Sequence, residues 1–187
     1  IHYSVTDMNQ PLGNYSGLMC EVVESINTLK GDGPQDLKEV TFHLAEKCLS
    51  LSGIENARQK IIDVINNGLA YEKFEKMIFA HGGKIKSISL NPSSNKVIKS
   101  SEEGYLNIID TKRIGMAIIE LGAGRKKIED TVDSQAGIKF FKKHGDMVKK
   151  NEPIFEVFSS NKDKIKVAHK MINQSIQIIN QLPNKFK

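Results

Sequence analysis

The chain has 187 residues, 39% of them hydrophobic, and a mean hydropathy of −0.34, which suffices for the core of one domain or two small ones. No apolar run approaches the roughly 18 residues that a membrane-spanning helix needs, and nothing resembles a signal peptide. A disulfide framework would need more than Cys20 and Cys48, so we expect two buried free thiols and a cytoplasmic protein.

The net charge of +5 is unevenly placed, because residues 139–170 hold nine lysines against four acids. A basic patch can indicate nucleic-acid binding. This one contains no arginine, the usual reader of bases and phosphates, and few aromatic residues. We therefore interpret it as a solvated face and expect no nucleic-acid partner.

The chain begins with Ile1–Val5, which reads as a short strand, followed by the loop Thr6–Gly13 and then a long helical pattern. A strand–loop–helix step is where α/β proteins place ligands, at the carboxyl end of a strand. We therefore expect an α/β enzyme, of which this chain is only the later part.

Apolar residues recur at helical spacing through the first half of the chain, in segments that end at glycines. Short strand-like runs begin after Gly83. The patterns predict helices at about 18–29, 34–51, 55–67, 70–80, 111–121 and 163–182, and strands at 84–90, 96–100, 104–109, 138–143 and 153–158. The change of texture predicts two domains, residues 1–83 and residues 84–187.

Two glycine-containing motifs have more than one interpretation. Gly122–Arg125 could cradle a phosphate, but it follows a helix rather than a strand, which favours a helix C-cap and tight turn. Gly145–Ile154 resembles the turn of biotinyl- and lipoyl-type barrels, although we find no modifiable lysine in a matching hairpin. A non-catalytic carrier or binding module therefore remains an alternative function.

No complete catalytic constellation is recognisable from the residues. The five histidines lack metal-ligand spacing, and no serine or cysteine has a nucleophile elbow with a partner histidine. The polar groups of Asp7, Asn9 and Gln10 make Thr6–Gly13 the remaining candidate site, with a capped turn as the alternative.

A set of motifs in collinear order covers nearly the whole chain. These are Thr6–Gly13, Glu21-Val22, Leu29–Pro34, Asp36-Leu37, Gly104-Tyr105, Asp110, Ile114–Ala117, Leu121–Arg125, Asp130–Asp133, Ala136–Ile138, Gly145-Asp146 and Glu152-Pro153. Together they resemble the pyrimidine-nucleoside phosphorylase and thymidine phosphorylase family. The resemblance implies the end of an α/β phosphorylase domain followed by a hammerhead-like C-terminal α+β domain.

The resemblance also implies a pentosyltransferase of nucleoside salvage. Inorganic phosphate attacks the anomeric carbon of a thymidine- or uridine-type nucleoside and releases the base and (deoxy)ribose 1-phosphate. In the family the phosphate- and base-binding residues lie upstream of the segment that Ile1 begins, so no catalytic residue is carried over. We expect the 187-residue chain alone to be inactive, the parent to be a homodimer through a mostly upstream helical domain, and no organic cofactor.

One site is carried over from the family, a monovalent cation site for potassium. The matching positions are Leu12 and Tyr15, through their backbone carbonyls, and Glu24, through its carboxylate. Oxygen ligands suit such a hard cation. Tyr15 stands where relatives often have a small residue, and the alternative for Glu24 is an exposed helix carboxylate.

Overall fold

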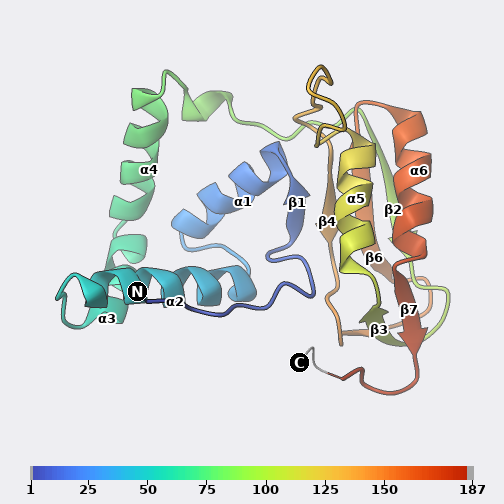
Figure 1. Ribbon diagram of the computed structural model, residues 1–187, viewed down its shortest axis with the longest axis horizontal. Helices are drawn as coiled ribbons and strands as arrows, with labels where there is room; N and C mark the ends of the chain where they lie inside the picture. Colours follow the sequence, from blue (N-terminus) through green and yellow to red (C-terminus); the bar gives the residue numbers. More distant parts are fainter. Residues whose placement is uncertain (1, 185–187) are drawn as a thin grey trace. The chain divides into compact units, whose positions relative to one another are not determined.

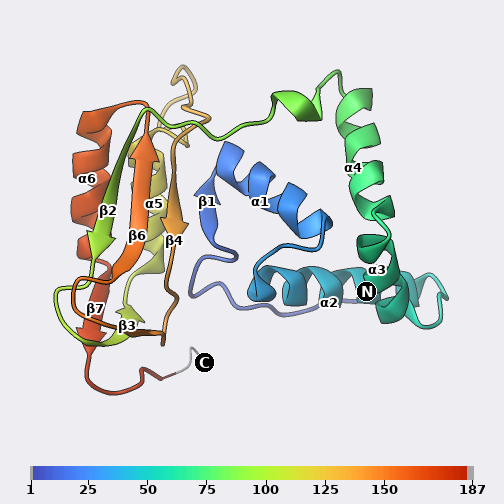
Figure 2. The same ribbon diagram turned by 180° about the vertical axis from the view of Figure 1, so that it is seen from behind.

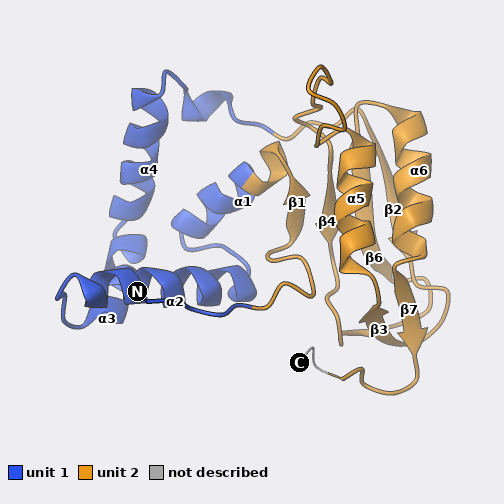
Figure 3. Ribbon diagram, in the orientation of Figure 1, with its two compact units in different colours: residues 1–6, 22–89 blue, residues 7–21, 90–187 orange. Residues whose placement is uncertain are grey.

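The computed structural model describes residues 2–184 and groups them into two compact units (Figure 3). The first unit contains residues 2–6 and 22–89, and the second contains residues 7–21 and 90–184. The division at residues 83 and 84 that we expect from the sequence stays a prediction.

The first unit is built from helices. Its elements are α1 (Met19–Leu29, whose first turn belongs to the second unit), α2 (Gln35–Leu51), α3 (Ala57–Asn66), α4 (Leu69–Ala80) and the 3₁₀ turn η1 (Ile85–Ser87). The four helices predicted in this region are confirmed. Gly68, at a φ of 81°, joins α3 to α4 in a backbone conformation that favours glycine.

Two strands predicted in this region are wrong. Residues 2–5 form no regular secondary structure, and Ile1 lies outside the described residues. In the segment 84–90, the amide and hydroxyl of Ser87 both donate to the carbonyl of Lys84, at 3.1 and 2.6 Å, and close a turn instead of extending a strand. The described part of the first unit contains no strand, so its assignment to an α/β domain stays a prediction.

The second unit contains two antiparallel sheets. One has the strand order β1-β4-β6-β2 and the other β5-β3-β7. The strands are β1 (Tyr15–Gly17), β2 (Ser94–Lys99), β3 (Gly104–Ile108), β4 (Gly137–Phe140), β5 (Met147–Val148), β6 (Pro153–Ser159) and β7 (Ile176–Ile179). This unit has the α+β character that the sequence predicts for the C-terminal domain.

Helices α5 (Thr111–Leu121) and α6 (Lys162–Asn173) pack against each other and cover one face of the four-stranded sheet (Figures 1 and 2). Side chains alternate across β4, so Ile138 and Phe140 are buried while Lys139 between them is half-buried. Phe140 meets Phe155 of β6 edge-on, with ring centroids 5.2 Å apart. These contacts form one hydrophobic core inside the second unit.

Close approach of β1 to β4 depends on glycine at two positions. A Cβ atom at Gly137 would lie 2.8 Å from both Cys20 Sγ and Ser16 O, and one at Gly17 would lie 2.5 Å from Ala136 O. Cys20 is buried beside them, as we expect from the sequence. Cys48 on α2 is exposed, so the expectation that it is buried is wrong.

The final predicted helix is only half right. Helix α6 ends at Asn173, and residues 176–179 form β7 opposite residues 105–108 of β3. The isoleucines of this segment fit both a helical and a strand period. The structure pairs the segment with β3, and the backbone hydrogen bonds of this pairing replace those of a helix. The remaining predicted strands at 96–100, 104–109, 138–143 and 153–158 are confirmed with shifted ends, whereas β1 and β5 were not predicted.

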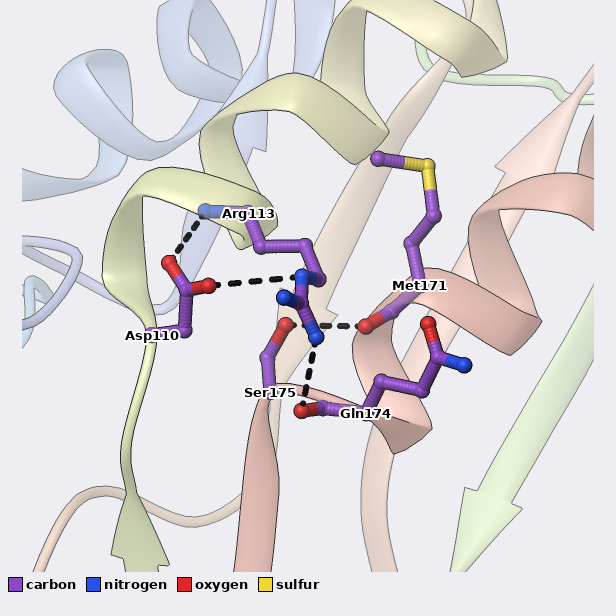
Figure 4. A network of polar contacts seen from close by, with 5 residues as sticks. All are labelled: Asp110, Arg113, Met171, Gln174 and Ser175. Carbon is purple, nitrogen blue, oxygen red and sulfur yellow. Dashed lines mark hydrogen bonds and ion pairs between the residues drawn. The ribbon is translucent and has the colours of Figure 1, made fainter.

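A polar network joins the start of α5 to the end of α6 (Figure 4). Asp110 caps α5 by accepting from the Arg113 amide at 2.8 Å, and it pairs with the Arg113 guanidinium at 3.3 Å. The guanidinium also donates to the carbonyl of Gln174 at 3.1 Å. The sequence predicts that either Asp110 or Thr111 caps this helix, and the structure shows that Asp110 does.

Among residues 2–184, no helix combines the length and the apolar character needed to cross a membrane.

Candidate functional site

The candidate segment from the sequence begins with a turn that Asp7 closes on Asn9. Asp7 Oδ1 accepts from the backbone amide of Asn9 at 2.8 Å and from its side-chain amide at 2.7 Å. This is the geometry of an Asx turn. It supports the capped-turn interpretation of these two polar residues.

The next residues, which we call the Asn9–Asn14 loop, form hydrogen bonds at both ends with other residues of the second unit. At the start, Thr111 Oγ1 donates to the Asn9 carbonyl, and Gln10 Oε1 accepts from the His144 amide at 3.2 Å. At the end, the Phe140 amide donates to the Asn14 carbonyl at 2.8 Å. The loop leads directly into β1 and thus into the sheet.

Lys143 binds the middle of the Asn9–Asn14 loop. Its ammonium donates to the carbonyl of Pro11 at 2.7 Å and to the carbonyl of Gly13. The same ammonium lies 5.5 Å from the ring centroid of Phe140. Nothing in the local sequence pattern around Lys143 predicts this role, since its partners lie 130 and 132 positions earlier in the chain.

The three expected cation ligands are distributed over both units. Leu12 lies in the Asn9–Asn14 loop, and Tyr15 is the first residue of β1, opposite Lys139 of β4. Glu24 lies on α1 and is grouped with the first unit. Its residue is only 6% exposed, so the alternative of an exposed helix carboxylate is wrong, while its role as a cation ligand stays a prediction.

The turn after α5 is the helix C-cap that the sequence favours. Gly122 has a φ of 103°, and its amide donates to the Ile119 carbonyl at 3.0 Å. The next amide, that of Ala123, donates to the Ile118 carbonyl at 3.2 Å. These amides donate to the last carbonyls of the helix, so their N–H groups do not point outward as those of a phosphate-binding loop do.

Asp133 joins segments that are distant in the sequence, and no local pattern predicts this role. Its Oδ2 accepts from the Ser160 amide at 2.7 Å and from the Ser159 hydroxyl at 3.0 Å. Its Oδ1 accepts from the Gln135 amide at 3.0 Å. Burial acts to raise the pKa of Asp133, but these hydrogen bonds outweigh it and hold that pKa below its usual value.

Several lysines of the basic segment 139–170 have partners inside the second unit. Lys142 pairs with Glu152 at 2.8 Å, and Lys139 lies 4.9 Å from the ring centroid of Phe141. Burial, followed by the charge of Lys96, lowers the pKa of His169 on α6, so that imidazole adds no charge to the segment at neutral pH. The interpretation of this surface as a solvated face stays a prediction.

Part of the second unit matches a known protein family. Residues 105–179 match the family described as "Pyrimidine nucleoside phosphorylase C-terminal domain". These residues run from β3 to β7 and include most of the second unit. The match supports neither a carrier module nor a biotinyl- or lipoyl-type barrel.

Individual relatives cover more of the chain. It is 36% identical over 178 residues to the pyrimidine-nucleoside phosphorylase of Staphylococcus epidermidis, covering 90% of this chain and 41% of the relative. It is 38% identical over 169 residues to the thymidine phosphorylase of Metamycoplasma hominis, covering 86% of this chain and 62% of the relative. The chain thus spans less than two thirds of these relatives, and it belongs to the pyrimidine-nucleoside and thymidine phosphorylase family, corresponding to its C-terminal portion.

Proposed function

We propose that this chain works as part of a pyrimidine-nucleoside phosphorylase. The reaction is the reversible attack of inorganic phosphate on the anomeric carbon of a thymidine- or uridine-type nucleoside, which releases the base and (deoxy)ribose 1-phosphate. The observation that carries the proposal is the 36–38% identity to enzymes of these names over 86–90% of the chain. The parent protein acts in the cytoplasm as a homodimer and needs no organic cofactor.

The second unit has a supporting role in this proposal. Charge develops on the sugar as the glycosidic bond breaks, so catalysis rests on positioned phosphate and base ligands. The described contacts of the Asn9–Asn14 loop hold that loop in place and supply no nucleophile or proton donor at a reacting atom. We expect the 187-residue chain by itself to be inactive.

A chimaera tests the function. The part of the Staphylococcus epidermidis enzyme that precedes the aligned segment is joined to this chain, and release of thymine or uracil is followed by ultraviolet absorbance in phosphate buffer. We expect turnover by the chimaera and none by this chain or by the staphylococcal part alone. Turnover by this chain alone contradicts its proposed inactivity, and a folded but inactive chimaera contradicts the proposed function.

We also propose that the carbonyls of Leu12 and Tyr15 bind a potassium ion together with the carboxylate of Glu24. Three oxygen ligands suit a monovalent cation, and the proposal rests on the resemblance of these three positions to the family's cation ligands.

The cation site is tested by Glu24→Gln, with Glu129→Gln at an exposed position as the matched control. The midpoint of thermal unfolding is measured against KCl, with choline chloride holding the ionic strength constant. Wild type and Glu129→Gln should gain stability with potassium, and Glu24→Gln should need at least about tenfold more, because it removes the charged ligand. Equal potassium dependence in all three proteins contradicts the site.

A further inference from the structure

The Lys143 ammonium is surrounded by backbone carbonyls in the way that a bound metal cation would be. An ammonium group offers three N–H donors and no acceptor. Two of its partners are the peptide carbonyls of Pro11 and Gly13, which flank Leu12. Two carbonyl oxygens of one short loop therefore face the same positive charge. Such oxygens are also the ligands that bind a monovalent cation.

The position of Lys143 favours a net contribution from this interaction. The side chain is half-buried, and its ammonium lies 5.5 Å from the centre of the Phe140 ring, on the strand that precedes it. Hydrogen bonds to a charged group are stronger than neutral ones, and partial burial protects them from the screening that weakens exposed pairs. The charge therefore holds the loop more firmly than a neutral side chain of the same length could.

The adjacent lysine provides an internal comparison. Lys142 Nζ lies 2.8 Å from the Glu152 carboxylate and 3.3 Å from the Met147 carbonyl, so these partners belong to β5 and to the turn that follows it. Consecutive lysines thus serve two different parts of the unit. A change at Lys142 removes the same charge from the same region without touching the Asn9–Asn14 loop.

We propose that Lys143 is a positioning residue whose ammonium acts as a built-in cation for the Asn9–Asn14 loop. It binds the carbonyls on either side of Leu12 and so sets the direction of the Leu12 carbonyl and the entry of the chain into β1 at Tyr15. The contacts at Asn9, Gln10 and Asn14 lie at the two ends of the loop, whereas Lys143 binds carbonyls in its middle.

The first test needs no substitution. Nuclear magnetic resonance measures the order parameter of each lysine NH₃⁺ group in the wild-type chain. The proposal requires a restrained, slowly exchanging ammonium for Lys143 and a mobile one for exposed Lys150. An order parameter for Lys143 as low as that for Lys150 overturns it.

The second test compares Lys143→Met with Lys142→Met. Methionine keeps an unbranched side chain that is one heavy atom shorter than lysine, and it removes the charge. Amide hydrogen exchange at residues 12–14 should accelerate at least about tenfold in Lys143→Met and less than about twofold in Lys142→Met, provided that circular dichroism shows both proteins folded. Wild-type exchange in folded Lys143→Met, or equal acceleration in both variants, overturns the proposal.

Chemical rescue separates charge from packing. Lys143→Ala removes the equivalent of propylammonium, so added propylammonium should restore protection of residues 12–14 and equimolar 1-propanol should not. Rescue by both compounds, or by neither, overturns the role of the charge. If the alanine variant does not fold, the ammonium order parameter of the wild-type chain decides the question.

A final readout rests on the proposed function. In the chimaera with the staphylococcal part, Lys143→Met should lower kcat/KM about tenfold, and propylammonium should restore it in Lys143→Ala. The exchange measurements distinguish the two possible failures. An inactive wild-type chimaera counts against the phosphorylase function, while unchanged loop exchange in Lys143→Met counts against Lys143.

Discussion

Asp133 joins the segment before β4 to the segment that follows β6, by accepting from Gln135, Ser159 and Ser160. A carboxylate that accepts several N–H and O–H bonds is stabilised in its charged form, which explains why the pKa of Asp133 is lowered although burial acts in the opposite direction. The ionisation of this one carboxylate therefore affects the stability of the second unit.

The lowered pKa gives a pH dependence with a definite sign. A carboxyl whose pKa is lower in the folded state than in the unfolded state stabilises the fold above its ordinary value of 3.8, and this stability is lost as the pH falls through the folded-state pKa. At pH 7, Asp133→Asn should lower the free energy of unfolding by about 2 kcal/mol. The difference from wild type should shrink below pH 4.

Urea denaturation at a series of pH values measures this effect. Asp163→Asn is the matched control, because the Asp163 side chain is 88% exposed and pairs with the exposed Lys166. We expect that control to change the free energy of unfolding by less than about 0.5 kcal/mol. A gap between Asp133→Asn and wild type that stays constant below pH 4 would contradict the assignment.

At the scale of elements, α5 and α6 are tied together where one begins and the other ends. The Arg113 guanidinium forms an ion pair with the carboxylate of Asp110, the N-cap of α5. It also donates to the Gln174 carbonyl at the C-terminus of α6. A positive charge at that end also complements the helix dipole. At the same end of α6, the Ser175 hydroxyl donates to the Met171 carbonyl at 2.8 Å (Figure 4).

Arg113→Met should therefore destabilise the second unit by about 1–2 kcal/mol, because it removes the guanidinium and keeps an unbranched apolar stem. Lys112→Met, at the exposed neighbouring position of α5, is the control and should have an effect near zero. Urea unfolding followed by far-ultraviolet circular dichroism measures both. Equal effects of the two substitutions would show that the link between α5 and α6 contributes nothing to stability.

At the scale of the whole molecule, the two units differ in how much of their own apolar surface they bury. Helices α2 and α4 contain no buried residue, whereas the core of the second unit includes fully buried Leu106, Phe155 and Ile172. Burial of apolar side chains is the main source of protection against local opening.

Amide hydrogen exchange should thus divide the chain. We expect amides in β3, β6 and α6 to exchange at least about a hundredfold more slowly than those in α2 and α4, when each is corrected for its intrinsic rate. Peptide-level mass spectrometry of the native chain at neutral pH measures the difference. Similar protection in both sets of elements would contradict it.

The candidate site was only partly accessible from the sequence. Leu12, Tyr15 and Glu24 were named because the order of motifs resembles a family, not because their spacing forms a recognisable ligand set. Lys143 was missed because its partners lie 130 and 132 positions away, and one lysine among nine in a basic segment has no local feature that marks it. Asp133 belongs to the motif Asp130–Asp133, but its partners Ser159 and Ser160 are likewise distant from it in the sequence.

By itself the sequence determined the family and the helices with a clear apolar period, because these depend on residue order and on contacts within a few positions. Only the tertiary structure decided that Ile176–Ile179 is a strand, that residues 2–5 are not, and that the Asn9–Asn14 loop rests on Lys143. The physical reason is common to all three: a strand needs a partner for its backbone and a buried charge needs ligands, and the fold brings both from distant parts of the chain.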